Sequence, residues 1–214
     1  MPRPLRVSPE RILAAAADEF AGRGYAGARV DRIARRARVN KAMLYYHFGS
    51  KLGLYRALLR SAFAELAARL EAIAATADPP PEKLGTVIRA MAAFVETHAF
   101  FPAIMLREVA EGGVHMDAAS LEALASVPRV FAAILTQGMR DGVFRPMHPL
   151  AAYFTTVAPI LMYVASTPVR RQLASRRLIM EPGVPLTAET FVGDLQQSLR
   201  LAFAAPPKAR SRSR

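Results

Sequence analysis

The stretch from residue 29 to residue 51 constrains the fold more than any other part of the chain, because it encodes two short helices around a tight turn. Its first half places four apolar residues at the i, i+3, i+4 and i+7 positions of one helical face: Val30, Ile33, Ala34 and Ala37. This spacing predicts a very short helix. Asn40 is a good N-cap for a second helix, and Gly49 is placed to end it. The segment is therefore predicted to form a helix-turn-helix.

The remaining segments are also predicted to be helical. Ser8 can cap a first helix, and Gly24 is suited to the left-handed position that stops it. That helix carries an apolar stripe of Ile12, Ala16 and Phe20. The three prolines after residue 78 break the chain between two helices. Besides the two short helices, we predict helices over residues 9–22, 51–77, 82–99, 102–111, 118–141, 149–166 and 187–204, with weaker helical character over 169–180. No segment shows a sustained period of two, so the predicted fold class is all-α.

Positive charge is concentrated at the two ends of the sequence. The 214 residues include 29 Lys and Arg against 17 Asp and Glu, a net charge of +12. Residues 1–60 hold 13 basic and 4 acidic residues, and residues 205–214 hold 4 basic residues and no acid. A general preference for Arg would not explain why acidic residues are scarce only in these two segments. We therefore interpret the N-terminal excess as functional, and it favours an anionic partner such as nucleic acid or an acidic membrane surface.

Several classes of function are disfavoured by what the sequence lacks. There is no cysteine, which excludes disulfides, thiolate catalysis and Cys-based zinc sites. No HExxH, GxSxG, Walker or GxGxxG motif is present, and we expect the four histidines, at 47, 98, 115 and 148, to stand apart from carboxylates at metal-ligand spacings. We therefore expect no enzyme, no metal and no cofactor. The first ten residues lack the apolar stretch of a secretory signal, which favours a cytoplasmic protein.

Three ordered motifs connect the helix-turn-helix segment to a known family. They are F-A-x-x-G-Y at residues 20–25, V-x-x-I-A at residues 30–34, and V-N-K-A-M-L-Y-Y-H-F-G-S-K at residues 39–51. The run from Ile12 to Leu59 resembles the N-terminal DNA-binding domain of the TetR family of bacterial transcriptional regulators. The resemblance covers about a quarter of the chain. It implies a DNA-binding domain over residues 1–51 and a larger helical domain over residues 52–205 that binds a small molecule and forms a dimer.

The second short helix would carry the residues that read DNA, because its first turn is the end that enters the major groove in helix-turn-helix proteins. Lys41 can donate to guanine, whereas Ala42 and Met43 offer apolar contact, for example to a thymine methyl. The base-reading candidates are Lys41, Ala42, Met43 and Tyr46. The candidates for contacts with the phosphate backbone are Arg29, Tyr45, His47, Ser50 and Lys51. Core packing of the aromatic residues is the alternative for this helix.

Two positions depart from the family pattern. Arg38 stands in the turn where many members have Gly, and a left-handed backbone there would cost about 1–2 kcal/mol. Ala28 and Arg29 stand where members often have Ser or Thr to cap the first short helix, and neither side chain offers an acceptor. We therefore expect a turn of slightly different shape, and a helix that frays or is capped from elsewhere.

The larger predicted domain is supplied with Met and Phe, whose side chains suit a ligand cavity. The residues predicted to line it are Met91, Phe94, His98, Phe101, Met105, Arg107, Glu108 and Met139. Stripes of Met and Phe are also common in cores, and Arg107 and Glu111, four residues apart, could simply pair with each other. The expected effector is a small apolar or amphipathic molecule.

A run without any charged residue extends from residue 146 to residue 169. Its length would span a bilayer, so a membrane-associated helical protein is the alternative function. The prolines, serines and threonines within the run favour burial in an oligomer interface instead. With the last helix, it would form a four-helix contact across a two-fold axis. The predicted dimer-interface residues are Tyr153, Val157, Leu161, Phe191, Leu195, Leu199 and Phe203.

A homodimer is also what the predicted DNA-reading helix requires. Two such helices related by a two-fold axis read a palindrome whose half-sites lie one turn apart, about 34–36 Å, or a multiple of that distance. The predicted function is a ligand-responsive transcriptional regulator, a repressor in the family's usual mode, that binds double-stranded operator DNA as a homodimer with no membrane partner. Residues 206–214, PPKARSRSR, are predicted to be a disordered basic tail, with a DNA-contacting arm as the alternative.

Overall fold

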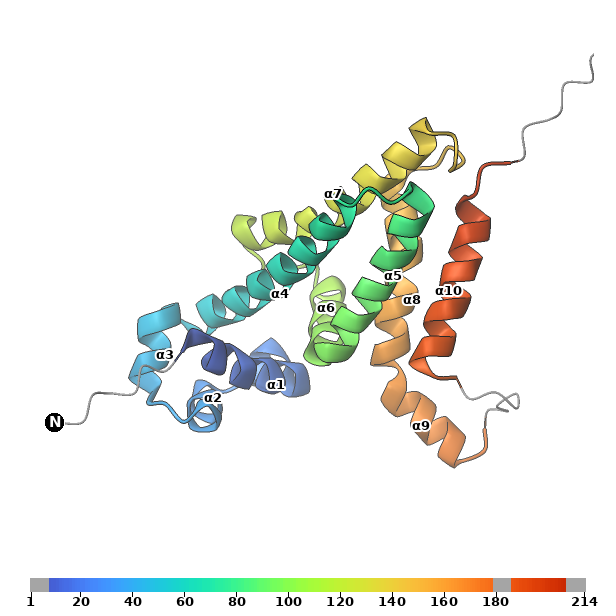
Figure 1. Ribbon diagram of the computed structural model, residues 1–214. Helices are drawn as coiled ribbons and strands as arrows, with labels where there is room; N and C mark the ends of the chain where they lie inside the picture. Colours follow the sequence, from blue (N-terminus) through green and yellow to red (C-terminus); the bar gives the residue numbers. More distant parts are fainter. Residues whose placement is uncertain (1–7, 179–185, 207–214) are drawn as a thin grey trace, which may run out of the picture. The chain divides into compact units, whose positions relative to one another are not determined.

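The structure, a computed structural model, describes residues 8–178 and 186–206, and these residues are predominantly helical (Figure 1). The ten helices of this part of the chain are α1 (Pro9–Gly27), α2 (Val30–Ala37), α3 (Lys41–Phe48), α4 (Lys51–Ala74), α5 (Pro80–Thr97), α6 (Phe100–Ala110), α7 (Ala118–Arg140), α8 (Pro149–Ala165), α9 (Thr167–Ser175) and α10 (Ala188–Phe203). Their one β-type pairing is an isolated bridge between Phe144 and Ala204. The predicted all-α fold class is confirmed. The predicted basic tail, from residue 207 onward, lies outside the described residues.

The predicted helices all occur, with shifts at their ends. α4 ends at Ala74, three residues before its predicted end, and α5 begins at Pro80. Proline is tolerated in the first turn of a helix, where an amide hydrogen has no partner to lose, so the prolines that break the chain also start the next helix. α9 occupies the segment for which only weaker helical character was predicted.

The described residues form two compact units whose boundaries fall inside α4, α5 and α7. The first unit consists of the described residues up to Leu66 together with Val95–Ser126. The second consists of Ala67–Phe94 together with the described residues from Val127 onward. These units do not coincide with the two domains predicted from the sequence, which divide at residue 51. That division stays a prediction about where the DNA-binding domain ends.

The first unit is organised around α1, which packs against both α2 and α6. The buried positions of α1 include the stripe of Ile12, Ala16 and Phe20. Gly24, with a φ of 68°, interrupts α1 where the sequence predicted its end, but a further turn continues to Gly27. The Ala28 amide closes that turn by donating to the Gly24 carbonyl at 3.2 Å. The sequence therefore located the break in α1 but not the turn that follows it.

The turn between α2 and α3 has a left-handed backbone at Arg38, with φ 53° and ψ 47°. A non-glycine residue in this conformation costs about 1–2 kcal/mol. Arg11 on α1 holds the turn in place: its Nε and Nη2 donate to the Ala37 carbonyl at 2.8 and 2.6 Å. Its Nη2 also donates to the Arg38 carbonyl at 3.1 Å. The left-handed conformation considered for Arg38 is therefore present, and side-chain hydrogen bonds from α1 offset its strain.

α2 begins without a capping side chain of its own, as the sequence indicated. Glu19 of α1 supplies the acceptor: its Oε1 accepts from the Arg29 amide at 3.1 Å and from Arg32 Nε at 2.7 Å. Burial is the largest single influence on the pKa of Glu19 and raises it. The hydrogen bonds from Arg32 and the Arg29 amide, with the charges of Arg32 and Arg23, nevertheless hold this pKa below its usual 4.5. α2 is therefore capped from elsewhere, by a carboxylate that stays charged at neutral pH.

The second unit contains α8 and α10, which lie side by side (Figure 1). α10 is tied to α5 by Gln196, whose Nε2 donates to the Gly85 carbonyl at 2.7 Å. The loop after α7 folds back on its own helix, because Gly138 leaves room for the ring of Phe144; a Cβ at position 138 would collide with that ring. The first contact joins α10 to the start of α5, and the second packs the loop after α7 against α7 itself.

The uncharged run over residues 146–169 is divided between two helices. α8 and α9 meet at Ser166 and are bent by 53° relative to each other. The run that suggested a membrane-associated protein is therefore a bent pair and not one straight helix. By length and composition alone, α7 is the one described helix long and apolar enough to cross a membrane, and two bent helix pairs would join it if each were a single span.

Candidate nucleic-acid interface

α3 presents one buried face and one exposed face. Asn40 caps the helix as predicted, because its Oδ1 accepts from the Met43 amide at 2.7 Å. Leu44 is buried, which fixes the rotation of the helix, whereas Tyr46 is 83% exposed. A large aromatic residue this exposed contributes nothing to a core, since burial is what makes such a ring stabilising. Core packing therefore accounts for Leu44 but not for Tyr46.

The predicted base-reading residues all lie on α3, and we call them the reading edge. Lys41 and Ala42 are exposed and Met43 is half-buried. With Tyr46 they offer one ammonium, two apolar groups and one phenol. This set can donate hydrogen bonds to base edges and contact a thymine methyl. Whether these residues touch DNA stays a prediction.

Lys41 is engaged within the protein. Its Nζ lies 2.9 Å from Asp31 Oδ1, which joins the start of α3 to the start of α2. The hydrogen bond and the charge of Asp31 raise the pKa of Lys41, and the same pair lowers the pKa of Asp31. Sequence reasoning missed this pair, although Asp31 is the one acidic residue between positions 29 and 51. Lys41 must exchange Asp31 for a base if it reads DNA.

Lys51, predicted to bind phosphate, is half-buried at the start of α4. Its Nζ donates to the Ala26 carbonyl at 3.2 Å and lies 4.7 Å from the centre of the Tyr25 ring. A cation over an aromatic face is attracted by the ring quadrupole. Lys51 therefore ties α4 to the last turn of α1, a role that the sequence reasoning did not assign to it.

Ser50 caps α4, since its Oγ accepts from the Gly53 amide at 2.9 Å. Gly53 is needed because a Cβ at this position would collide with the Phe48 carbonyl oxygen. The close approach sets α4 directly against the end of α3. The first turn of α4, with its amide groups and the positive end of the helix dipole, is suited to an anion such as a phosphate group.

The other predicted phosphate-binding residues lie on the same segment. Arg29 is exposed, and its amide is held by Glu19. Tyr45 is 42% exposed, and the half-buried His47 meets the ring of Tyr46 edge-on at 5.3 Å. The structure therefore gathers all the predicted DNA contacts on the start of α2, on α3 and on the start of α4, within the first unit.

The predicted ligand-pocket residues are divided between the two units. Met91, Phe94 and Met139 belong to the second unit, and the other five belong to the first. The four buried apolar members are Met91, Phe94, Phe101 and Met105. These four side chains are core residues of their own units, as is usual for Met and Phe on helices.

Arg107 is committed to the end of α1. Its Nη1 donates to the Phe20 and Ala21 carbonyls at 3.1 and 2.6 Å. Both carbonyls lie in the turn before Gly24, where the non-helical backbone interrupts α1, so the guanidinium supplies donors beside that break. Arg107 therefore joins α6 to α1 instead of forming the pair with Glu111 that the sequence allowed.

Two histidines lie beside carboxylates, so the expectation that they stand apart is wrong. His98 Nε2 is 3.3 Å from Glu65 Oε2, and His115 Nδ1 is 2.7 Å from Glu108 Oε1. A sequence signal existed for the second contact, because residues 108, 111 and 115 repeat at the i, i+3, i+7 spacing of one helical face. α6 ends at residue 110, however, and it is the turn after it that returns His115 to Glu108.

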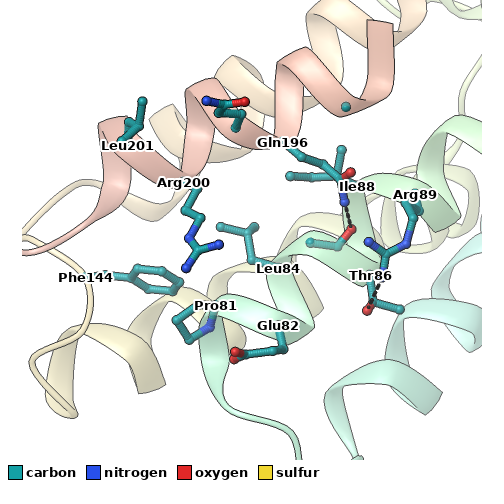
Figure 2. A pocket seen from close by; sticks show the side chains of 13 residues that line it. Pro81, Glu82, Leu84, Thr86, Ile88, Arg89, Phe144, Gln196, Arg200 and Leu201 are labelled. Carbon is teal, nitrogen blue, oxygen red and sulfur yellow. Dashed lines mark hydrogen bonds between the residues drawn. The ribbon is translucent and has the colours of Figure 1, made fainter. Parts of the chain in front are cut away.

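A cavity of about 760 Å³ lies in the second unit between α5 and α10 (Figure 2). Apolar lining residues include Leu84, Ile88 and Phe144, and Arg200 points from α10 into the space beside them. On α5, the Arg89 guanidinium also lines the cavity. The lining residues do not include any of the eight predicted from the sequence. Apolar groups beside guanidinium groups suit an amphipathic molecule with an anionic group.

The predicted dimer-interface residues fall into two groups. Tyr153, Leu199 and Phe203 are buried within the chain itself, and burial raises the pKa of Tyr153 to about 12. These three contribute to the core of the second unit, and their assignment to a dimer interface stays a prediction. The half-buried members are Val157, Leu161, Phe191 and Leu195. The large apolar residues of α8 that are exposed are Leu150, Phe154 and Met162; the last two directly follow the predicted Tyr153 and Leu161.

Comparisons with known proteins match both parts of the chain. The family described as bacterial regulatory proteins, tetR family, matches residues 12–58, and the tetracyclin repressor-like C-terminal domain matches residues 80–191. The HTH-type transcriptional repressor NicS of Pseudomonas putida is 28% identical over 190 residues, which cover 87% of this chain and 89% of that protein. The HTH-type transcriptional activator FasR of Mycolicibacterium smegmatis is 37% identical over 86 residues, which cover 40% of this chain and only 39% of that protein.

The fold is also found among solved structures. The ketosteroid transcriptional regulator KstR2 of Mycobacterium tuberculosis superposes with a TM-score of 0.70 and 23% identity, over 92% of this chain and 95% of that chain. At this identity the likeness supports the fold alone. Because the family matches extend over both the helix-turn-helix segment and more than half of the remaining sequence, the chain belongs to the TetR family of bacterial transcriptional regulators.

Proposed function

We propose that this chain is a ligand-responsive repressor that binds a palindromic operator as a homodimer in the cytoplasm. The observation that carries the proposal is the exposed reading edge of α3: a capped helix fixed by the buried Leu44, with Tyr46 83% exposed on its outer face. It stands in a sequence segment, residues 1–60, with 13 basic and 4 acidic residues. An exposed helix face in a basic helix-turn-helix is suited to the major groove.

Base reading is assigned to Lys41, Ala42, Met43 and Tyr46. Lys41 would leave Asp31, 2.9 Å away in the free protein, to donate to guanine O6 or N7. Ala42 and Met43 would contact apolar groups such as a thymine methyl. Lys41 would then replace its hydrogen bond to Asp31 with one to a base, so that base recognition would cost few hydrogen bonds.

Phosphate contacts are assigned to Arg29, Tyr45, His47, Ser50 and Lys51. Ser50 and Lys51 stand at the amino end of α4, where the helix dipole favours an anion. The Lys51 ammonium, which contacts the Ala26 carbonyl and the Tyr25 ring in the structure, would turn to a phosphate group. Such contacts fix the register of the protein on DNA and supply affinity that falls as salt rises.

The homodimer is assigned to α8 and α10. The exposed Phe154 and Met162 on α8 and the half-buried Phe191 and Leu195 on α10 support an apolar contact there. An apolar surface that is buried in a symmetric pair is stabilising because it leaves water. Two copies of the reading edge would then face successive turns of a palindromic site.

The effector is assigned to the class of small amphipathic molecules. The cavity between α5 and α10 supports this, because it combines Leu84, Ile88 and Phe144 with the guanidinium groups of Arg89 and Arg200. A ligand releases DNA only if it binds the DNA-free arrangement of the dimer more tightly than the DNA-bound one. Mass spectrometry of small molecules that co-purify with the protein would identify a candidate.

The decisive experiment is a mobility-shift assay with DNA from upstream of the protein's own gene and its neighbours. We expect a shift that weakens as salt is raised, and a reporter gene under the same DNA that is silenced by the protein. No shift at low salt with a dimeric sample would contradict DNA binding. Activation of the reporter would contradict repression but not DNA binding.

Two variants separate the assigned roles. Lys51→Ala should weaken binding to all sequences and reduce the slope of log K against log salt by about one, whereas Lys41→Ala should relax specificity at one base position. Because Lys51 also ties α4 to α1, thermal unfolding of each variant must be measured beside DNA binding. If both variants change affinity and specificity alike, the division into base and phosphate contacts is wrong.

A further inference from the structure

We propose that Glu108, Glu111 and His115, at the end of α6 and the turn after it, form a binding site for a divalent transition metal ion such as Zn²⁺. The site lies wholly within the first unit and involves none of the residues assigned to DNA contact. It therefore stands or falls independently of the proposed function.

The turn after α6 brings the three residues together. Gly112 and Gly113 have φ of 74° and 73°, a backbone conformation that favours glycine. The Gly113 amide donates to the Glu108 carbonyl at 2.8 Å, which closes the turn against the helix end. Arg56 Nε donates to the His115 carbonyl at 2.8 Å and holds the segment that follows the turn. The position of His115 beside Glu108 is thus fixed by the main chain and not only by the side chains.

The spacing of the donor atoms suits a small metal ion. His115 Nδ1 lies 2.7 Å from Glu108 Oε1 and 3.5 Å from Glu111 Oε2, and one donor atom from each residue lies within 4.8 Å of the others. Ligands at about 2.0–2.2 Å from a tetrahedral zinc ion stand about 3.3–3.6 Å apart. Small side-chain movements are therefore sufficient to place all three on one ion, with a fourth position for water.

An unsatisfied buried oxygen is the second observation, and it is independent of the spacing. Glu108 is only 1% exposed, and its Oε2 has no hydrogen-bond partner among the described residues. The other oxygen, Oε1, accepts from the Tyr55 hydroxyl at 2.7 Å. A buried carboxylate oxygen without a donor costs free energy, and a cation bound through Oε2, the second oxygen of the same carboxylate, would remove that cost.

The surroundings favour a site that keeps its geometry. The ring of Tyr25 lies 4.1 Å from that of His115, and the ring of Tyr55 lies 5.6 Å from it, so aromatic side chains restrict the imidazole. Imidazole nitrogen is a preferred ligand of Zn²⁺, whereas Mg²⁺ prefers oxygen ligands and water. One nitrogen and two carboxylates therefore favour a transition metal over Mg²⁺. Coordination through Nδ1 would replace the proton that Nδ1 otherwise donates to Glu108.

The test is isothermal titration of the full-length, chelator-treated protein with Zn²⁺. The variant is Glu111→Gln, because Glu111 is 51% exposed and its replacement should not disturb folding. His98→Gln is the matched control, since His98 also lies beside a glutamate in the same unit. We expect one Zn²⁺ per chain in the wild type and in the control, an affinity at least about tenfold lower in Glu111→Gln, and no binding of Mg²⁺.

Co²⁺ provides a second readout that does not depend on stability. A Co²⁺ ion in a site of low coordination number absorbs strongly in the visible range, so the wild type and the control should show bands that Glu111→Gln lacks. Equal Zn²⁺ affinity in the wild type and Glu111→Gln would overturn the proposal, as would equal loss in His98→Gln. Failure of the wild type to bind Zn²⁺ would also overturn it and would assign the three residues to hydrogen bonding alone.

Discussion

The reading edge of α3 and the group formed by Tyr55, Glu108, Glu111 and His115, which we call the Glu108 cluster, lie in the same compact unit. Each places polar groups beside aromatic rings. The reading edge belongs to one helix of eight residues with its own cap, and its polar groups face outward. The Glu108 cluster is assembled from α4, α6 and a glycine turn, and its central carboxylate is buried.

The two sites differ in which contacts fix the positions of their side chains. The reading edge is ordered by local features, an N-cap and one buried leucine, so changes on its exposed face should affect binding and leave folding intact. The Glu108 cluster is ordered by contacts between distant segments, so changes there should affect folding first. Substitutions in the two sites should therefore differ in whether they change stability or binding.

The largest effect is expected for Leu44→Ala. Leu44 is buried and fixes the rotation of α3, so its truncation leaves a cavity and should lower the free energy of unfolding by about 2–5 kcal/mol. Urea denaturation followed by circular dichroism measures this change. The control is Tyr46→Ala on the opposite face, which should change stability by less than about 0.5 kcal/mol while weakening DNA binding. Similar losses of stability in both would mean that α3 does not have the two distinct faces described above.

The next effect is expected in the Glu108 cluster. Burial, together with the hydrogen bond to Glu108, raises the pKa of Tyr55, so its hydroxyl stays protonated and donates at 2.7 Å. Tyr55→Phe removes this donor from a buried carboxylate and should lower the free energy of unfolding by about 1–3 kcal/mol. Tyr46→Phe, at an exposed phenol, is the matched control and should be neutral. If Tyr55→Phe has the same free energy of unfolding as the wild type, the cluster is not important for folding.

A smaller, pH-dependent effect is expected for Glu19, which caps α2 from α1. Its pKa is lower in the folded protein than its usual 4.5, so its stabilising contribution is present above that value and is lost as the pH falls through the folded pKa. At pH 7, Glu19→Ala should cost about 1–2 kcal/mol, typical for loss of a cap with charged partners. Unfolding measured from pH 7 to pH 3 should show a weaker pH dependence in Glu19→Gln than in the wild type. The exposed Glu71→Gln is the control for the same charge change and should have the wild-type free energy of unfolding at pH 7.

The smallest effect is expected at the left-handed turn. Arg38→Gly removes the backbone strain of about 1–2 kcal/mol but increases the freedom of the unfolded chain, so a net stabilisation of about 0.5–1 kcal/mol remains. Thermal or urea unfolding measures it. Arg35→Gly, inside α2, should instead destabilise by about 0.5–1 kcal/mol. Destabilisation by both substitutions would contradict the strain assigned to Arg38.

Most of the fold could be predicted, because helix boundaries depend on residues close together in the sequence. Asn40, Gly49 and the prolines after residue 78 located helix ends to within a few residues. The end of α1 was missed because Gly24, which the sequence placed at the end of the helix, is followed by one more turn that the Ala28 amide closes. The cap of α2 was left open for a similar reason, since Glu19 stands ten residues before the amide that it accepts from.

The sites were predicted less evenly. The face of α3 was predicted correctly, because a single buried leucine and an N-cap define it. On α8, where nearly every residue is apolar, the pattern does not distinguish a core face from an exposed one. The sequence pattern therefore could not show that Tyr153 is buried and Phe154 exposed. The cavity between α5 and α10 was not foreseen, because its lining comes from segments more than a hundred residues apart.

Caps, periodic spacing and an ordered motif are local properties, and they were sufficient to predict the helical class and the helix-turn-helix. That the reading edge contacts DNA stays a prediction. Only the tertiary structure decided what each polar side chain bonds to: Lys41 to Asp31, Arg107 to the end of α1, Glu108 to Tyr55 and His115. The physical reason is that hydrogen bonds and ion pairs require atoms within about 3 Å, a condition that depends on how distant helices pack.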